Sequence, residues 1–260
     1  MNNDYLTTLF GLKGKVAAVI GGGGYLCSEM AKGLARAGAS VVILDKNDQQ
    51  RDSVASEIKK ITPSILSLPL DATKKESHQQ ALKQILKKFK SVDILINGAG
   101  INAPTPFFEI KVEDWQAIVD SHITATFLAC QVFGQYMVKQ KRGLIINMSS
   151  ASSGPPLSKA FAYSVAKSGV KNLTQNLARE WAPFNVRVNA LRPGFFPTQW
   201  SMKNFIDDKR KSAILGHTPM GRFGKPEELV SAVIWLCSDS ASFVTGAEIA
   251  IDGGFSAMTI

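Results

Sequence analysis

VAAVIGGGGYLCSEMAKGLARAGA, residues 16–39, runs from an apolar segment through four consecutive glycines into a segment whose apolar side chains recur at helical spacing. Glycines at a strand-to-helix turn let the backbone approach a pyrophosphate, and the helix N-terminus offers free N–H groups to it. This order is typical of the first βαβ unit of a nucleotide-binding sheet. The stretch therefore predicts a dinucleotide site at the turn.

An acidic residue ends the next apolar segment. Asp45 lies 24 residues after Gly21. A carboxylate at this place accepts hydrogen bonds from the ribose diol of an adenosine and repels a 2′-phosphate. Asp45 therefore favours NAD over NADP. The neighbouring Lys46 could meet a 2′-phosphate, which leaves NADP as the less favoured cofactor.

Short β-branched segments recur along the chain, and they are apolar almost throughout, as strands buried on both faces of a parallel sheet are. They are 15–20, 40–45, 65–70, 92–97, 143–148, 186–191 and 247–251. Segments with helical spacing alternate with them: 26–37, 48–60, 74–90, 113–140, 160–182 and 226–238. Strand and helix in alternation predict an α/β protein. We expect a single-domain Rossmann fold over residues 1–260, with a doubly wound parallel seven-stranded sheet and helices on both faces.

Residues 195–224, FFPTQWSMKNFIDDKRKSAILGHTPMGRFG, interrupt this alternation. The segment is long, mixed in character and follows a strand end. Ligands of doubly wound sheets bind outside the carboxyl ends of the strands. We therefore expect residues 195–224 to form a substrate-binding lid.

Composition limits the partners. No apolar stretch approaches the roughly 20 residues of a membrane span, and the N-terminus lacks the basic-then-apolar order of a signal peptide. We expect a cytoplasmic protein without a membrane partner. The net charge of +9 indicates nucleic acid or an anionic ligand. Because no basic run is interleaved with stacking aromatics, we expect no nucleic acid and a small anionic substrate. Three separated cysteines and no histidine cluster predict no metal site.

Several motifs stand in a fixed order, and Ser150 precedes Tyr163 by 13 residues. They are the glycine turn at 21–27, DAT at 71–73, NGAG at 97–100, Ser150, Tyr163 with Lys167, RPGFFPT at 192–198 and VTGAEIAIDGGFSA at 244–257. With this set the chain resembles the short-chain dehydrogenase/reductase family over nearly its whole length. The glycine turn, HTPMGRFGKPEEL and DGGFSA look most like the sugar-acid branch, with its D-mannonate oxidoreductase-like and gluconate dehydrogenase-like members.

The resemblance implies a catalytic set. Tyr163 is the acid/base, and the Lys167 ammonium lowers its pKa and holds the nicotinamide ribose. Ser150 orients the substrate oxygen, and Ser152 also faces the substrate. Arg192 either clamps a substrate carboxylate or makes a structural ion pair. The implied cofactor-binding residues are Gly21, Gly24, Tyr25, Leu26, Asp45, Lys46, Asp71, Ala72, Asn97, Ala99, Gly100, Tyr163, Lys167, Pro193, Gly194, Phe196 and Thr198.

Two departures from the family stand out. Tyr25 and Cys27 occupy positions that are usually glycine, and His122 stands where the family has an asparagine that holds a water between the lysine and solvent. A histidine can hold the same water, and it titrates near neutrality, so it would add a component to the pH dependence of turnover. His122 is therefore a catalytic candidate. The alternative is an interior histidine with satisfied hydrogen bonds.

The sequence predicts an NAD(H)-dependent oxidoreductase that interconverts a secondary alcohol and a ketone on a sugar acid or polyol. One alternative is an NADPH-dependent 3-oxoacyl-carrier-protein reductase, whose acidic partner would suit the basic chain. The other is a nucleotide-binding protein without turnover. The family resemblance also implies a homotetramer, formed through 113–140, 160–182 and the C-terminal strand.

Overall fold

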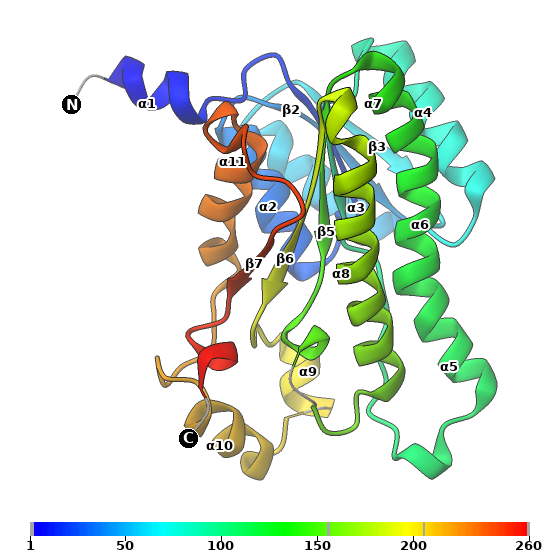
Figure 1. The fold of residues 1–260 in the computed structure, drawn as a ribbon, viewed down its shortest axis with the longest axis vertical. Coiled ribbons are helices and arrows are strands. Elements are labelled where there is room, and N and C mark those ends of the chain that lie inside the picture. The colour runs from blue at the N-terminus through cyan, green and yellow to red at the C-terminus, as the bar shows by residue number, and fades with distance from the viewer. Residues whose placement is uncertain (1–2, 155–156, 205, 259–260) are drawn as a thin grey trace.

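A computed structural model describes residues 3–154, 157–204 and 206–258. Its sheet has seven parallel strands in the order β3-β2-β1-β4-β5-β6-β7 (Figure 1). They are β1 (Val16–Ile20), β2 (Ser40–Asp45), β3 (Ile65–Pro69), β4 (Ile94–Asn97), β5 (Gly143–Met148), β6 (Val186–Pro193) and β7 (Glu248–Ile251). All seven predicted strands are confirmed, with ends that differ by at most two residues.

The helices flank the sheet. They are α1 (Asn3–Phe10), α2 (Tyr25–Arg36), α3 (Asp48–Lys59), α4 (Lys75–Phe89), α5 (Val112–Val119), α6 (Ala125–Ala129), α7 (Gln135–Gln140), α8 (Phe161–Trp181), α9 (Gln199–Asn204), α10 (Asp208–Gly216) and α11 (Val230–Cys237). Two π-helical turns, Asp120–Thr124 and Cys130–Gly134, join α5, α6 and α7 into one continuous helical stretch. The six predicted helical segments are confirmed, whereas α1, α9 and α10 were not predicted.

Alternate residues of the central strand pack into two separate cores. Ala17 and Val19 of β1 contact the apolar faces of α2, α3 and α11. Ala18 and Ile20 contact the faces of α4, α7 and α8, on the other side of the sheet. Because both faces are covered, the strands must be apolar at every position, which is the pattern seen in the sequence. The single-domain, doubly wound α/β fold is confirmed.

One helical stretch also has the properties of a membrane span. Among the described residues, Val112–Gln140 is 29 residues long and apolar enough to cross a bilayer, and half of its most apolar window is buried inside the fold. The stretch meets this test on average, by length and composition alone, and it is not the unbroken apolar run of about 20 residues that the sequence was expected to lack. The stretch owes its apolarity to the second core, because Phe133 and Met137 of this stretch are fully buried there.

The sheet order places the functional elements. From β1 the sheet grows in one direction through β2 and β3, and in the other direction through β4 to β7. Ligands of such sheets bind at the carboxyl ends of the strands, where the strand order reverses. The glycine turn lies at this edge, and α9 and α10 form most of the regular structure in residues 195–224. Phe205, inside that segment, lies outside the described residues.

Candidate active site

The glycine turn packs closely against the end of β4. Gly21 has φ +73°, and a Cβ atom added to it would lie 2.7 Å from the backbone nitrogen of Ala99. Only glycine combines that conformation with that approach. α2 begins at Tyr25, directly after Gly24, so its unbonded N–H groups face the carboxyl edge of the sheet. The turn therefore has the geometry that a pyrophosphate needs.

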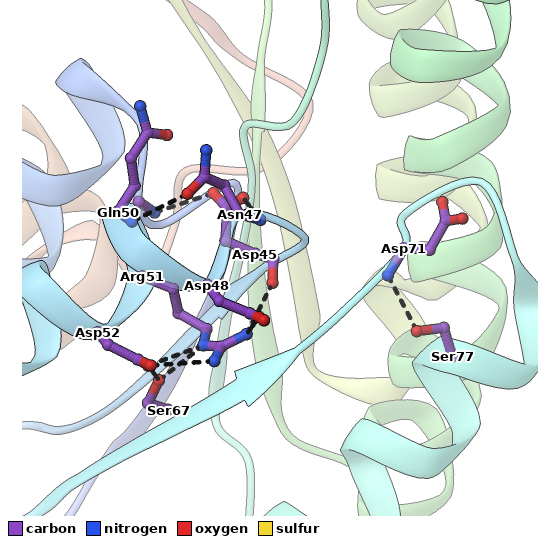
Figure 2. A network of polar contacts seen from close by, with 10 residues as sticks. Asp45, Asn47, Asp48, Gln50, Arg51, Asp52, Ser67, Asp71 and Ser77 are labelled. Carbon is purple, nitrogen blue, oxygen red and sulfur yellow. Dashed lines mark hydrogen bonds and ion pairs between the residues drawn. The ribbon is translucent and has the colours of Figure 1, made fainter.

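Asp45 is fixed beside this turn. Its Oδ2 accepts a hydrogen bond from the Gly23 backbone N–H at 3.0 Å, and its Oδ1 accepts one from the Asn47 N–H at 3.0 Å (Figure 2). A cleft of about 280 Å³ opens over it. Seven further predicted cofactor residues line this cleft: Gly21, Gly24, Lys46, Asp71, Ala72, Ala99 and Gly100.

Arg51, whose guanidinium also reaches the Asp45 carbonyl, forms ion pairs with carboxylates. Arg51 has a side chain only 9% exposed, and its guanidinium binds Asp48 at 2.5 Å and Asp52 at 3.0 Å. Its Nε also donates to the Ser67 hydroxyl at 2.8 Å (Figure 2). The hydrogen bonds to Asp52 and Asp48 outweigh burial and raise the pKa of Arg51. The positive charge of Arg51 is therefore balanced by the carboxylates of Asp48 and Asp52.

A second cleft, of about 430 Å³, continues from the first and shares Gly21, Gly24 and Gly100 with it. The structure brings most predicted site residues together along its walls: Tyr25, Leu26, His122, Ser150, Tyr163, Lys167, Pro193, Gly194, Phe196 and Thr198. The two clefts share lining residues and together extend from Asp45 to Tyr163.

Asn97 does not line either cleft. Its side chain is 5% exposed, and its Nδ2 donates to the Oδ1 of Asn147 at 2.8 Å. Its side chain is thus an interior link between β4 and β5. The predicted role of Asn97 in cofactor binding stays a prediction, although the strand directs its side chain into the core.

Tyr163 and Lys167 lie on the same face of α8; Lys167 is buried and Tyr163 is half-buried. The Lys167 Nζ donates to the Met148 carbonyl at 2.5 Å and lies 5.5 Å from the centre of the Tyr163 ring. Burial lowers the pKa of Lys167 to about 8. Burial also raises the pKa of Tyr163, and a hydrogen bond with Ser150 lowers it by less. In the protein alone, desolvation of the phenolate therefore outweighs the expected help from the ammonium.

His122 lies in the first π-helical turn and is 5% exposed. Its Nε2 lies 2.8 Å from the Ile101 carbonyl, so this nitrogen carries the proton and donates it. Burial, and then the charge of Lys167, lower the pKa of His122 to about 3. The imidazole is neutral at ordinary pH, and the expectation that it titrates near neutrality is wrong.

The other nitrogen of His122 lacks a partner. Nδ1 is buried and accepts no hydrogen bond from the described residues. The ring packs edge-on against Tyr163, with 5.0 Å between ring centres. A Cβ atom on Gly100 would lie 1.8 Å from the His122 Cε1, so glycine is required there. A buried, unpaired acceptor beside Tyr163 is a place for a water molecule.

The turn that carries Ser150 is held by a carboxylate that sequence reasoning missed, Glu248. Glu248 of β7 has a side chain 9% exposed. It accepts hydrogen bonds from the hydroxyls of Ser149 at 2.6 Å and Ser153 at 2.8 Å, on either side of Ser150. It also pairs with Lys171, one turn after Lys167, at 3.3 Å. Its signal in the sequence is an acidic residue inside an otherwise apolar strand.

Arg192 takes part in the same cluster. Its Nη1 lies 3.3 Å from the Glu248 Oε2, and Arg192 is absent from the described lining of the substrate-side pocket. Of the two roles that the sequence leaves open, the structure shows the ion pair. The carboxylate clamp is not supported, because the last strand supplies the arginine with a carboxylate of its own.

A third pocket, of about 180 Å³, adjoins Tyr163. Ser150 and Ser152 contribute hydroxyls to it, as predicted for the substrate side. Residues 195–224 form part of its wall through Phe195, Phe196, Pro197, Ser201, Ile206 and Arg210. Within the described residues, no group of three His, Cys, Asp or Glu side chains is arranged to hold a metal ion.

Comparisons with known proteins agree with this geometry. The profile of a family described as enoyl-(acyl carrier protein) reductase matches residues 26–256. The uncharacterized oxidoreductase UxuB of Bacillus subtilis is 38% identical over 95% of this chain and 96% of its own length. The 2-dehydro-3-deoxy-D-gluconate 5-dehydrogenase of Formosa agariphila is 36% identical, over 95% of this chain and 94% of its own.

Two further relatives bear on the substrate and on the choice between NAD and NADP. The 3-oxoacyl-[acyl-carrier-protein] reductase FabG of Thermotoga maritima is 32% identical over 94% of this chain and 98% of its own length. The crystal structure of a gluconate 5-dehydrogenase from Burkholderia cenocepacia, in complex with NADP and tartrate, is 28% identical, with a TM-score of 0.92. The similarity covers 97% of this chain and 99% of that one.

Proposed function

This chain belongs to the short-chain dehydrogenase/reductase family, in its sugar-acid branch, and from that premise we propose that it is an NAD(H)-dependent oxidoreductase that interconverts a secondary alcohol and a ketone on a sugar acid or polyol. It is an oxidoreductase that acts on CH–OH groups and binds a nicotinamide cofactor, as the family does. The observation that carries the proposal is the meeting of Ser150, Tyr163 and Lys167 in the second cleft, which shares lining residues with the cleft at Asp45.

The chain's own residues supply the proton chemistry. The Ser150 hydroxyl binds the substrate oxygen and orients it against the Tyr163 hydroxyl, which takes the alcohol proton in oxidation and returns it in reduction. The cofactor, held along the glycine turn, Asp45 and Lys167, supplies or accepts the hydride when bound. Lys167, held by the Met148 carbonyl, places its ammonium beside the tyrosine ring.

The experiment that tests the reaction follows absorbance at the reduced-nicotinamide band. The purified protein is assayed with NAD and NADP against sugar acids, neutral polyols and an acetoacetyl thioester. Turnover of sugar acids or polyols is the expected result. Turnover of the thioester alone would assign the chain to the FabG-like alternative, and nucleotide binding without any turnover would exclude an enzyme.

The preference for NAD rests on Asp45 and on the neutralised Arg51. Replacing Asp45 with alanine removes the charge that repels a 2′-phosphate, and Lys46 remains to attract it. Since hydrogen bonds to charged groups contribute about 1.5–3 kcal/mol, the ratio of kcat/KM for NAD to that for NADP should fall by about 10- to 100-fold. Steady-state kinetics with both cofactors measure this ratio.

The control for cofactor choice is Asp239→Ala. Asp239 pairs with Lys15, and it lines a different pocket at the opposite edge of the sheet. Asp239→Ala changes the net charge by the same amount as Asp45→Ala, and Asp239 does not line the cofactor cleft. Equal use of NAD and NADP by the parent protein, or an unchanged ratio in Asp45→Ala, would contradict the assignment.

We propose that His122 holds the water that links Lys167 to solvent, using its unpaired Nδ1 as acceptor. His122→Leu leaves that water without a partner, and we expect turnover to fall by about 10-fold or more, as loss of a buried hydrogen-bond partner costs about 1–3 kcal/mol. His122→Asn should keep substantial activity. Because the pKa of His122 is about 3, neither variant should remove a titration near pH 6–7 from the parent profile.

The readout for His122 is kcat across pH 5–9, with thermal melting and cofactor affinity as controls for folding. Both variants should bind the cofactor as the parent does. If His122→Leu turns over like the parent at every pH, the water relay is wrong and the residue only fills the helix interior.

We also propose that the protein acts in the cytoplasm on an anionic small molecule, as a homotetramer with residues 195–224 as a lid. Exposed apolar side chains beside α5 and α8 support the assembly: Phe108 is fully exposed, Val112 is 75% exposed and Val165 is 56% exposed. The lid is supported by the residues of α9 and α10 that line the substrate pocket.

A further inference from the structure

The pocket beside Tyr163 has one charged group on its wall. Of the described residues that line it, Arg210 alone carries a full charge at neutral pH. The remaining lining residues are apolar, amide or hydroxyl-bearing, with Ser150, Ser152 and Ser201 among the hydroxyls. Hydroxyls and an amide suit the hydroxyl groups of a sugar chain, whereas the guanidinium suits an anion.

Arg210 is positioned by contacts from different parts of the chain. α10 begins after Asp207, whose side chain accepts a hydrogen bond from the Arg210 backbone N–H at 2.7 Å. The Arg210 Nη2 donates to the Ser158 carbonyl at 3.1 Å, in the loop that leads into α8. The same loop brings Leu157 and Ala160 to the pocket. The arginine thus joins the lid helix to the segment that precedes Tyr163.

The other cations near Tyr163 do not line this pocket in the part of the chain that the structure describes. Lys167 lines the cofactor cleft and donates to the Met148 carbonyl. Arg192 pairs with Glu248. Lys209 and Lys211, on either side of Arg210, are exposed and do not appear among the described lining residues. Of these three consecutive cations, Arg210 is therefore the one that lines the pocket.

We infer that Arg210 binds the carboxylate of the substrate and selects sugar acids over neutral polyols. A guanidinium presents five N–H donors in a planar fork that matches a carboxylate with two parallel bonds. This inference rests on the proposed function for its substrate class, and it assigns to that class a receptor in the lid rather than at Arg192.

The test compares acids with alditols of the same chain length, such as D-gluconate with D-sorbitol. Their dissociation constants are measured with the enzyme saturated by reduced cofactor, through the fluorescence of the reduced nicotinamide, so that no turnover is needed. Because a charged hydrogen bond contributes about 1.5–3 kcal/mol, Arg210→Met should weaken acid binding by about 10- to 100-fold. Sorbitol binding should change by less than about twofold, since it offers no charge to the guanidinium.

Two further variants make the comparison specific. Arg210→Lys keeps the charge without the fork and should restore part of the acid affinity. Lys209→Met removes an equal charge from the same helix, and because exposed charges are screened its effect should stay below about twofold. Thermal melting of each variant with cofactor verifies that α10 has not been disturbed.

The outcomes separate this inference from the proposed function. Equal weakening of acid and alditol in Arg210→Met would assign the arginine a structural role through Ser158 and overturn the inference, as would unchanged acid binding. A parent protein that binds no sugar acid would overturn it as well. If the parent binds acids through Arg210 yet oxidises none of them, the inference stands and the proposed reaction fails.

Discussion

Replacing Tyr163 with phenylalanine is expected to lower kcat by about 10²- to 10⁴-fold, the contribution of a positioned general acid or base. The change deletes one hydroxyl and little volume, so the packing of the ring against His122 is retained. The hydroxyl that exchanges the proton with the substrate oxygen is lost. Cofactor affinity should stay near that of the parent, because Asp45, the glycine turn and Lys167 are unchanged.

The matched control is Tyr136→Phe. Tyr136 of α7 packs against the second core, away from the clefts, and the substitution is chemically identical. Stopped assays at high enzyme concentration extend the measurable range to the slow variant, and titration of reduced cofactor verifies binding. If Tyr163→Phe keeps more than half of the parent rate, the acid/base assignment is wrong.

Replacing Lys167 with methionine is expected to abolish turnover and, in the protein without cofactor, to raise stability. Burial lowers the pKa of Lys167 from 10.5 to about 8. At about 1.4 kcal/mol for each pH unit, that depression corresponds to a cost of about 3 kcal/mol for keeping the charged group inside. Methionine has a similar length and no charge, and it forfeits only the bond to the Met148 carbonyl.

The pH dependence of this effect has a definite sign. Below pH 8 the lysine is charged in both states, and the folded state bears the full cost of the buried charge. Between pH 8 and 10.5 the unfolded chain binds more protons at this site than the folded one, so this lysine makes the protein more stable as pH rises. Lys167→Met removes that rise.

Urea unfolding at pH 7 and pH 9.5 measures the difference. At pH 7 we expect Lys167→Met to have a free energy of unfolding about 1–3 kcal/mol above the parent, after the loss of the carbonyl bond. Lys211→Met, at an exposed position, is the control and should follow the parent. A Lys167→Met protein that is less stable than the parent at pH 7 would contradict the cost assigned to the buried ammonium.

The fold was predictable because its determinants are local in the sequence. Strands buried on both faces must be apolar at every position, and the glycine turn must combine a positive φ at Gly21 with close contact to Ala99. α1 was not predicted, because its helical character comes from packing beside α11 and from the bond of the Ser240 hydroxyl to the Leu9 carbonyl, far along the chain.

The chemical identities of the site were predictable, whereas its electrostatics were not. Spacing places Tyr163 and Lys167 on one face of a helix. It does not show that both are desolvated, or that His122 is neutral beside them. The partner of Arg192 lies 56 residues away on β7. The ion pair of Arg192 depends on the sheet order, which places β7 beside β6, so sequence spacing left the role of Arg192 open.

The carboxylate of Glu248 also sets when catalytic competence can arise during synthesis. It is bonded to Ser149 and Ser153 across 99 and 95 residues of chain. A growing polypeptide that has left the ribosome only as far as β6 carries the serine, tyrosine and lysine, but the turn that holds Ser150 still lacks its anchor. Contacts of such long range form late, because the loop they close is costly in entropy. The strands and helices around the glycine turn can therefore fold first on the ribosome. The turn that carries Ser150 takes its working shape only after residue 248 has been added.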